Sequence, residues 1–294
     1  MEVPSENLPS NVIALVFDFD DTLVPDSTSK FLDLKGIPSK NFWKKDAKAL
    51  VRSGCDPTLA FLKLFLDNIG PNKPLGLLTN KDLRKFGKTL DDHIYPGLPG
   101  LFDDLKRTVK RFRDVSIEFY IVSGGLQPII EGTGLVRKHH FSAVYGCQLG
   151  EEPGTNTVKF IKRAISFTEK TRYLFEISKG ILPSKARRNP YLVNEFPGTR
   201  IPFSNMIYVG DGLTDIPCFS LVGKRGGIPF GVFDSTKTRS AKRAFLKFLI
   251  PGRVKGMHTP RYGREDDLGI HLRSAVATIC SQIKLARVKT QRAI

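Results

Sequence analysis

Two pairs of aspartates follow directly after apolar segments of the sequence, Asp18 with Asp20 and Asp211 with Asp215. The first pair comes after residues 12–17, Val-Ile-Ala-Leu-Val-Phe, a run typical of a strand buried on both faces of a parallel sheet. Ligands of open α/β sheets bind at the carboxyl ends of such strands. Because Mg²⁺ is held by a few carboxylates together with water and phosphate oxygens, the two pairs predict a magnesium site.

Groups suited to binding phosphate follow another apolar run. Residues 117–122 lead into Ser123 and Gly124, which offer a hydroxyl and backbone N–H groups able to cradle a phosphate. Lys179 supplies a positive charge able to neutralise an anionic transition state. Four other lysines lie in the same interval and remain alternatives: Lys159, Lys162, Lys170 and Lys185.

The elements that must position these groups alternate along the chain. Besides residues 12–17 and 117–122, short apolar runs cover residues 143–147, 206–209 and 228–233. Longer segments with helical periodicity separate them. This alternation predicts an α/β fold built on a Rossmann-like parallel sheet.

Residues 26–95 differ from the rest because they show helical periodicity without strand patterns. They predict a helical domain inserted after the first strand. Residues 1–25 and 96–294 then form the α/β core with a basic C-terminal extension. Asp56 or Thr58 is expected to cap one helix of the insert.

The C-terminal region carries most of the net charge of +17. Residues 235–294 contain fourteen Lys or Arg and three acidic residues. Such a surface attracts nucleic acid, an anionic membrane surface or a phosphorylated substrate, although a solvated basic face explains it equally well. Residues 268–288 predict an amphipathic helix, which we expect to pack on the core.

Composition excludes several classes of protein. The N-terminus lacks the basic and apolar segments of a secretory signal, and every apolar run is too short to span a membrane. The four cysteines form no CxxC pair, so we expect reduced thiols and no zinc site. The sequence therefore predicts a soluble cytoplasmic protein.

Taken together, the motifs resemble those of the haloacid dehalogenase (HAD) superfamily of hydrolases, over residues 12–233. Residues 18–22, Asp-Phe-Asp-Asp-Thr, match the first motif, Ser123 the second, Lys179 the third, and residues 210–215, Gly-Asp-Gly-Leu-Thr-Asp, the fourth. Lys179 is preferred because the family pattern often has a lysine followed by a helix. The helical insert resembles the cap of phosphoserine phosphatase-like members, which closes over a small substrate and selects its leaving group.

The resemblance implies a mechanism and a set of roles. Asp18 would attack phosphorus to form an aspartyl phosphate, and Asp20 would protonate the leaving oxygen and then activate water. The remaining expected roles are phosphate binding by Thr22, Ser123, Gly124 and Lys179, and Mg²⁺ binding by Asp18, Asp20, Asp211 and Asp215.

An aspartate at position 20 favours phosphate esters over halogenated substrates, because it supplies the proton that an alkoxide leaving group needs. The resulting hypothesis is a Mg²⁺-dependent phosphatase acting on a small phosphorylated substrate. A phosphotransferase using the same intermediate stays open. Two further alternatives are a phosphatase of nucleotides or nucleic-acid ends, and a HAD-fold binding module without turnover.

Overall fold

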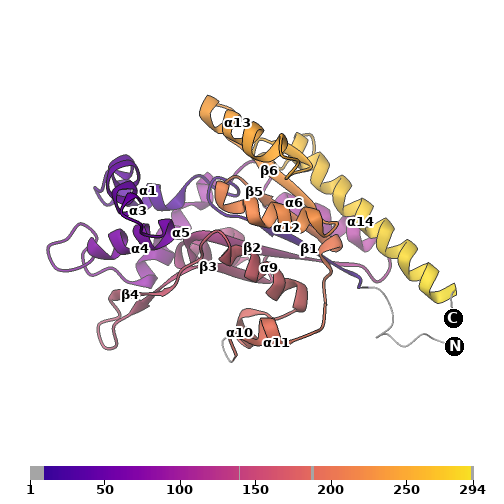
Figure 1. Ribbon diagram of the computed structural model, residues 1–294, viewed down its shortest axis with the longest axis horizontal. Coiled ribbons are helices and arrows are strands. Elements are labelled where there is room, and N and C mark those ends of the chain that lie inside the picture. Colours follow the sequence, from indigo (N-terminus) through magenta and orange to yellow (C-terminus); the bar gives the residue numbers. More distant parts are fainter. Residues whose placement is uncertain (1–9, 139, 187–188, 293–294) are drawn as a thin grey trace.

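A mostly parallel sheet of seven strands forms the centre of the structure, a computed structural model that describes residues 10–138, 140–186 and 189–292 (Figure 1). The strand order is β4-β3-β2-β1-β5-β6-β7, and only β4 runs antiparallel to its neighbour. The strands are β1 (Val12–Phe17), β2 (Ser116–Leu126), β3 (Ala143–Glu151), β4 (Val158–Arg163), β5 (Met206–Gly210), β6 (Ile228–Val232) and β7 (Gly256–His258).

The five predicted strand segments all lie in this sheet, which confirms the α/β fold class. β1 is the central strand because its apolar side chains are buried on both faces between β2 and β5. β4 and β7 were not predicted. β4 is largely exposed and mixes basic with apolar residues, and β7 has only three residues, so neither carries a long continuous apolar run.

Helices fill the interval between β1 and β2, as the periodicity predicted. The first of the larger helices in this insertion, α4, begins where Asp56 accepts hydrogen bonds from the backbone N–H groups of Thr58 and Leu59. The elements are α1 (Ser27–Leu34), α2 (Ser39–Asn41), η2 (Phe42–Ala47), α3 (Lys48–Arg52), α4 (Pro57–Asp67), α5 (Asn80–Thr89), η3 (Asp91–His93) and α6 (Gly100–Lys110).

The insertion is tied to the sheet through α5, which packs against α7 (Gln127–Gly132). The two backbones approach so closely at Gly87 that a Cβ there would lie 2.2 Å from the carbonyl oxygen of Ile129. A second tie joins the backbone N–H of Val158 on β4 to the carbonyl of Leu78. The C-terminal part of the predicted cap therefore packs on the sheet layer.

The remaining helices cover the sheet and its edges. α14 packs along α6 and buries Leu272, Val276, Ile279 and Ile283, as its amphipathic pattern predicted. These helices are α8 (Gly134–Arg137), α9 (Glu169–Lys179), α10 (Pro183–Ala186), α11 (Leu192–Glu195), η4 (Phe203–Asn205), η5 (Leu213–Asp215), α12 (Ile216–Lys224), α13 (Thr238–Ala244), η6 (Phe245–Leu249) and α14 (Asp267–Arg292). Within the described ranges, none of the helices combines the length and apolar character needed to cross a bilayer.

Candidate active site

Asp18 stands at the carboxyl end of the central strand. Its backbone N–H continues the pairing of β1 with β5 by donating to the carbonyl of Val209, at 2.8 Å. Its side chain accepts a hydrogen bond from the backbone N–H of Phe19, at 2.7 Å. Beyond Phe19 the chain coils tightly, with Asp21 in the left-handed region at φ 53°. The strand end and this coil together aim Asp18 at the edge of the sheet.

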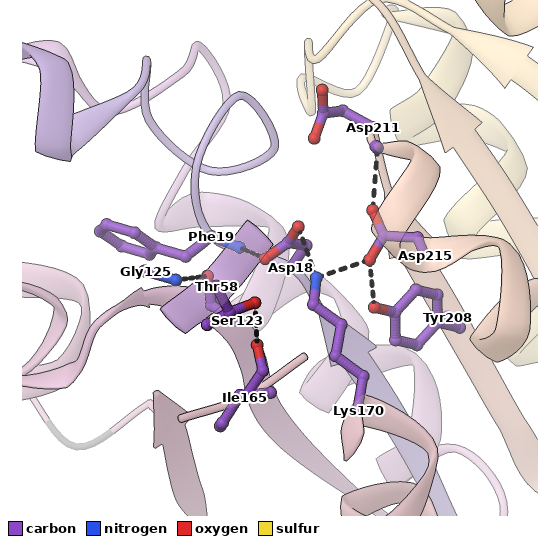
Figure 2. A network of polar contacts seen from close by, with 12 residues as sticks. Asp18, Phe19, Thr58, Ser123, Gly125, Ile165, Lys170, Tyr208, Asp211 and Asp215 are labelled. Carbon is purple, nitrogen blue, oxygen red and sulfur yellow. Dashed lines mark hydrogen bonds and ion pairs between the residues drawn. The ribbon is translucent and has the colours of Figure 1, made fainter. Parts of the chain in front are cut away.

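Lys170 is the lysine that reaches Asp18. Its Nζ lies 2.8 Å from Asp18 Oδ2 and 2.7 Å from Asp215 Oδ1, and its side chain is 1% exposed (Figure 2). Lys170 lies in the first turn of α9, whose N-terminal end faces the carboxyl edge of the sheet.

The prediction that placed Lys179 here was wrong in position. Lys179 is at the other end of α9, nine residues or roughly 14 Å along the helix axis. Its Nζ donates instead to the carbonyls of Val193 and Phe196, both at 2.7 Å. Lys179 thus stabilises the end of α11 and takes no part in the aspartate cluster.

The side chain of Asp215, a residue of the fourth motif, accepts three hydrogen bonds. Oδ1 accepts from Lys170 and from the hydroxyl of Tyr208 at 2.6 Å, and Oδ2 accepts from the backbone N–H of Gly212 at 2.8 Å. The side chain is fully buried. With both oxygens engaged, Asp215 is well placed to orient Lys170.

Asp20 approaches the C-terminal part of β2, where the pairing with β3 shifts register between Val122 and Leu126. A Cβ on Gly125 would lie 2.4 Å from Asp20 Oδ2, so only a glycine leaves room for this carboxylate. Asp20 Oδ1 accepts from the backbone N–H of Ser27, at 2.7 Å. The Ser123 hydroxyl accepts from the N–H of Gly125, at 3.1 Å. Asp20, Ser123 and Gly124 all line the same cavity as Asp18.

Burial raises the pKa values of Asp18 and Asp20, the two aspartates of the first motif, by different amounts. It raises the pKa of Asp18 to about 6, against the opposing pull of the Lys170 ammonium. Burial and the nearby Asp26 carboxylate raise the pKa of Asp20 to about 8. Burial therefore favours the protonated form of Asp20 more strongly than that of Asp18, which Lys170 keeps closer to the ionised form.

The carboxylates of Asp18, Asp211 and Asp215 form a group whose oxygens lie within 4.8 Å of one another. Burial and the charges of Asp215 and Asp18 raise the pKa of Asp211 well above its usual value. Lys170 and Arg243, the latter 3.5 Å from Asp211, supply two positive charges against three carboxylates, whose oxygens are the ligand type that a divalent cation such as Mg²⁺ prefers. Asp211 is the most open of the three carboxylates, because only one of its oxygens has a protein partner, Arg243 at 3.5 Å. Both oxygens of Asp18 and of Asp215 accept hydrogen bonds from protein groups.

A cavity of about 220 Å³ lies over these groups. The insertion contributes Thr28, Trp43 and Phe61 to its lining, and the core contributes Ser123 and Lys170. A larger cavity of about 660 Å³ adjoins it and shares Asp21 and Asp211 as lining residues. Together the two cavities offer space for a small molecule beside the aspartates.

Thr22 does not reach this cavity, so its predicted contact with phosphate is not found. The side chain is fully buried beneath the coil after β1, and its carbonyl accepts a hydrogen bond from the Tyr262 hydroxyl at 2.7 Å. Thr22 therefore belongs to the packing that supports the loop.

Sequence reasoning missed Tyr208 and the residues that the insertion contributes to the cavity, Thr28, Trp43 and Phe61. Tyr208 lies two residues before Gly210 on β5, inside an apolar run in which its hydroxyl gave no separate signal. Trp43 lies in an irregular helical stretch of the insertion, and no pattern marked it as facing the site. For Lys170, the available signal was its position at the start of a helix.

Comparison with known proteins identifies the fold. No family model matches the chain. An uncharacterized protein from Borreliella burgdorferi is 27% identical over 237 residues, covering 74% of this chain and 80% of that protein. A HAD family hydrolase from Salmonella enterica serovar Typhi aligns with a TM-score of 0.55 and 15% identity, over 87% of this chain and 69% of that one.

The probable phosphoserine phosphatase from Vibrio cholerae, in its unliganded form, aligns with a TM-score of 0.54 and 14% identity. The alignment covers 94% of this chain and 69% of that one. The chain therefore has a HAD-like fold, as the resemblance predicted.

Proposed function

We propose that this protein is a Mg²⁺-dependent phosphatase that hydrolyses a small phosphate monoester through an aspartyl phosphate on Asp18. The observation that carries the proposal is the arrangement around Asp18. Lys170 holds one of its oxygens, and Asp20, with its raised pKa, lines the same cavity of about 220 Å³. The likeness in fold to a HAD family hydrolase and a probable phosphoserine phosphatase supports the same reaction class.

In the first step, a carboxylate oxygen of Asp18 attacks phosphorus and the bond to the leaving oxygen breaks. Asp20 donates its proton to that oxygen, so an alcohol departs. In the second step, Asp20 accepts a proton from water as the water oxygen attacks phosphorus. The bond to Asp18 breaks, and inorganic phosphate is released.

The remaining groups neutralise and orient the phosphoryl oxygens. Lys170 supplies a fixed positive charge, held in place by Asp215 and, through it, by Tyr208. Ser123 and the backbone N–H of Gly124, which line the same cavity as Lys170, bind phosphoryl oxygens. Mg²⁺, held by Asp18 and Asp211, would offset the negative charge of the transferring group.

The test is phosphate release from a generic aryl phosphate, with and without Mg²⁺, for the wild type and for Asp18→Asn. We expect metal-dependent release that the substitution abolishes. A single-turnover experiment should then trap labelled phosphate on the wild-type chain and none on the variant. Equal release by both proteins would rule out Asp18 as the nucleophile.

A further inference from the structure

Exposed apolar side chains gather on the segment that follows α13, at one edge of the molecule. Phe245, Leu246, Leu249 and Ile250 are 47%, 47%, 39% and 65% exposed. In the described part of the chain, no other stretch of six residues has more than two such side chains. Clustered apolar exposure of this kind marks an interaction surface, whereas single exposed leucines need no explanation.

The opposite face of this segment is firmly packed. Ala244 and Phe248 are buried, and the Phe248 ring lies edge-on to Phe219 with centroids 5.3 Å apart. The segment is thus an ordered part of the fold, and its outer face has nothing from the described chain over it. Figure 1 shows α13, the helix that leads into this segment, at the margin of the molecule beyond β6.

Positive charge surrounds the apolar side chains. Residues 235–264 contain nine Lys or Arg and no acidic residue. Lys242, Lys247 and Lys255 are exposed, and no carboxylate of the described residues forms an ion pair with them. The apolar and basic side chains therefore lie together on one outward surface, which we call the α13 surface (residues 242–255).

We propose that the α13 surface docks the protein peripherally on an anionic lipid bilayer. A segment with exposed Phe, Leu and Ile among lysines suits the interface of such a membrane, where the apolar groups enter the acyl boundary and the lysines contact anionic headgroups. Nucleic acid would use the charge but leave the apolar side chains in water. A second copy would bring two surfaces of like charge together, which opposes association.

The test is co-sedimentation of the full-length protein with vesicles of phosphatidylcholine alone, or of phosphatidylcholine with about one-third phosphatidylglycerol. We expect at least about tenfold stronger partitioning onto the anionic vesicles, weakening as salt is raised. Equal partitioning onto both kinds of vesicle, or no dependence on salt, would overturn the proposal. This part of the test needs no variant.

Paired variants separate the two contributions. The charge pair Lys242→Gln/Lys247→Gln and the apolar pair Leu246→Gln/Ile250→Gln should each lower partitioning about tenfold. The matched control pairs lie in the insertion and should leave partitioning unchanged. They are Lys81→Gln/Lys88→Gln and Leu34→Gln/Leu77→Gln.

Two results would replace the membrane with another partner. If only the charge pair matters and an oligonucleotide competes with the vesicles, the α13 surface binds nucleic acid. A dimer in sedimentation equilibrium that Leu246→Gln/Ile250→Gln dissociates would assign the surface to a second copy. Thermal melting of each variant confirms that the fold is retained.

Discussion

The ammonium group of Lys170 lies between Asp18 and Asp215, at 2.8 Å from one carboxylate and 2.7 Å from the other. All three side chains are almost completely buried. The two carboxylates raise the pKa of Lys170 above its usual value, although burial alone would lower it. The lysine is therefore a permanent positive charge beside the proposed nucleophile.

Lys170→Met should lower kcat for phosphate release about 10²- to 10³-fold, because the charge that stabilises the transferring group is lost. Lys179→Met is the matched control, since that lysine contacts only carbonyls at the end of α11, and its kcat should stay close to that of the wild type. Steady-state kinetics at saturating Mg²⁺ makes the comparison, with thermal melting to check folding. A larger loss of kcat in Lys179→Met than in Lys170→Met would favour Lys179 as the lysine of the third motif.

The pH dependence of kcat/KM should be bell-shaped. Asp18 must be ionised to attack, so activity should fall as pH drops toward about 6, or lower where Mg²⁺ stabilises the carboxylate. Asp20 must be protonated to release an alcohol, so activity should fall as pH rises through about 8. Asp26→Asn removes a charge that raises the pKa of Asp20, and should move the alkaline limb to lower pH. An unchanged alkaline limb in that variant would argue against Asp20 as the acid.

Mg²⁺ should stabilise the wild type against thermal unfolding, by about 2.7 kcal/mol when the free ion is about 100 times its Kd. Asp211→Asn removes a proposed ligand and should lose most of this increment, while its metal-free form should be no less stable because a buried like charge has gone. Chelation should abolish phosphate release. Asp46→Asn, at an exposed site in the insertion, serves as the control. A full increment in Asp211→Asn would remove that residue from the metal site.

Gly87→Ala should destabilise the protein by about 1–3 kcal/mol, because its Cβ would overlap the Ile129 carbonyl at the contact of α5 with α7. Gly100→Ala is the control, since no atom lies within 4 Å of the added Cβ and that helix position favours alanine. Urea denaturation measures both. Similar stabilities for the two variants would show that α5 can move away from the sheet.

The sequence by itself determined five of the seven strands and several residues of the candidate site. Asp18, Asp20 and Asp211 were predictable because each follows an apolar strand directly, and local order along the chain places strand ends at one edge of a parallel sheet. Ser123 followed from the same rule. The insertion was predictable as helical because its periodicity is a local property of the chain.

Only the tertiary structure decided which lysine joins the aspartates. Lys170 and Asp18 are 152 residues apart, so no local pattern links them, and five lysines in one interval fit the motif equally well by type. Which lysine reaches Asp18 depends on which end of α9 faces the carboxyl edge of the sheet. Tyr208 contacts the site although it was not predicted, and Thr22 does not contact it although it was predicted. Both differences have the same cause, because the packing of distant segments decides whether a polar side chain meets a cavity or a neighbouring backbone.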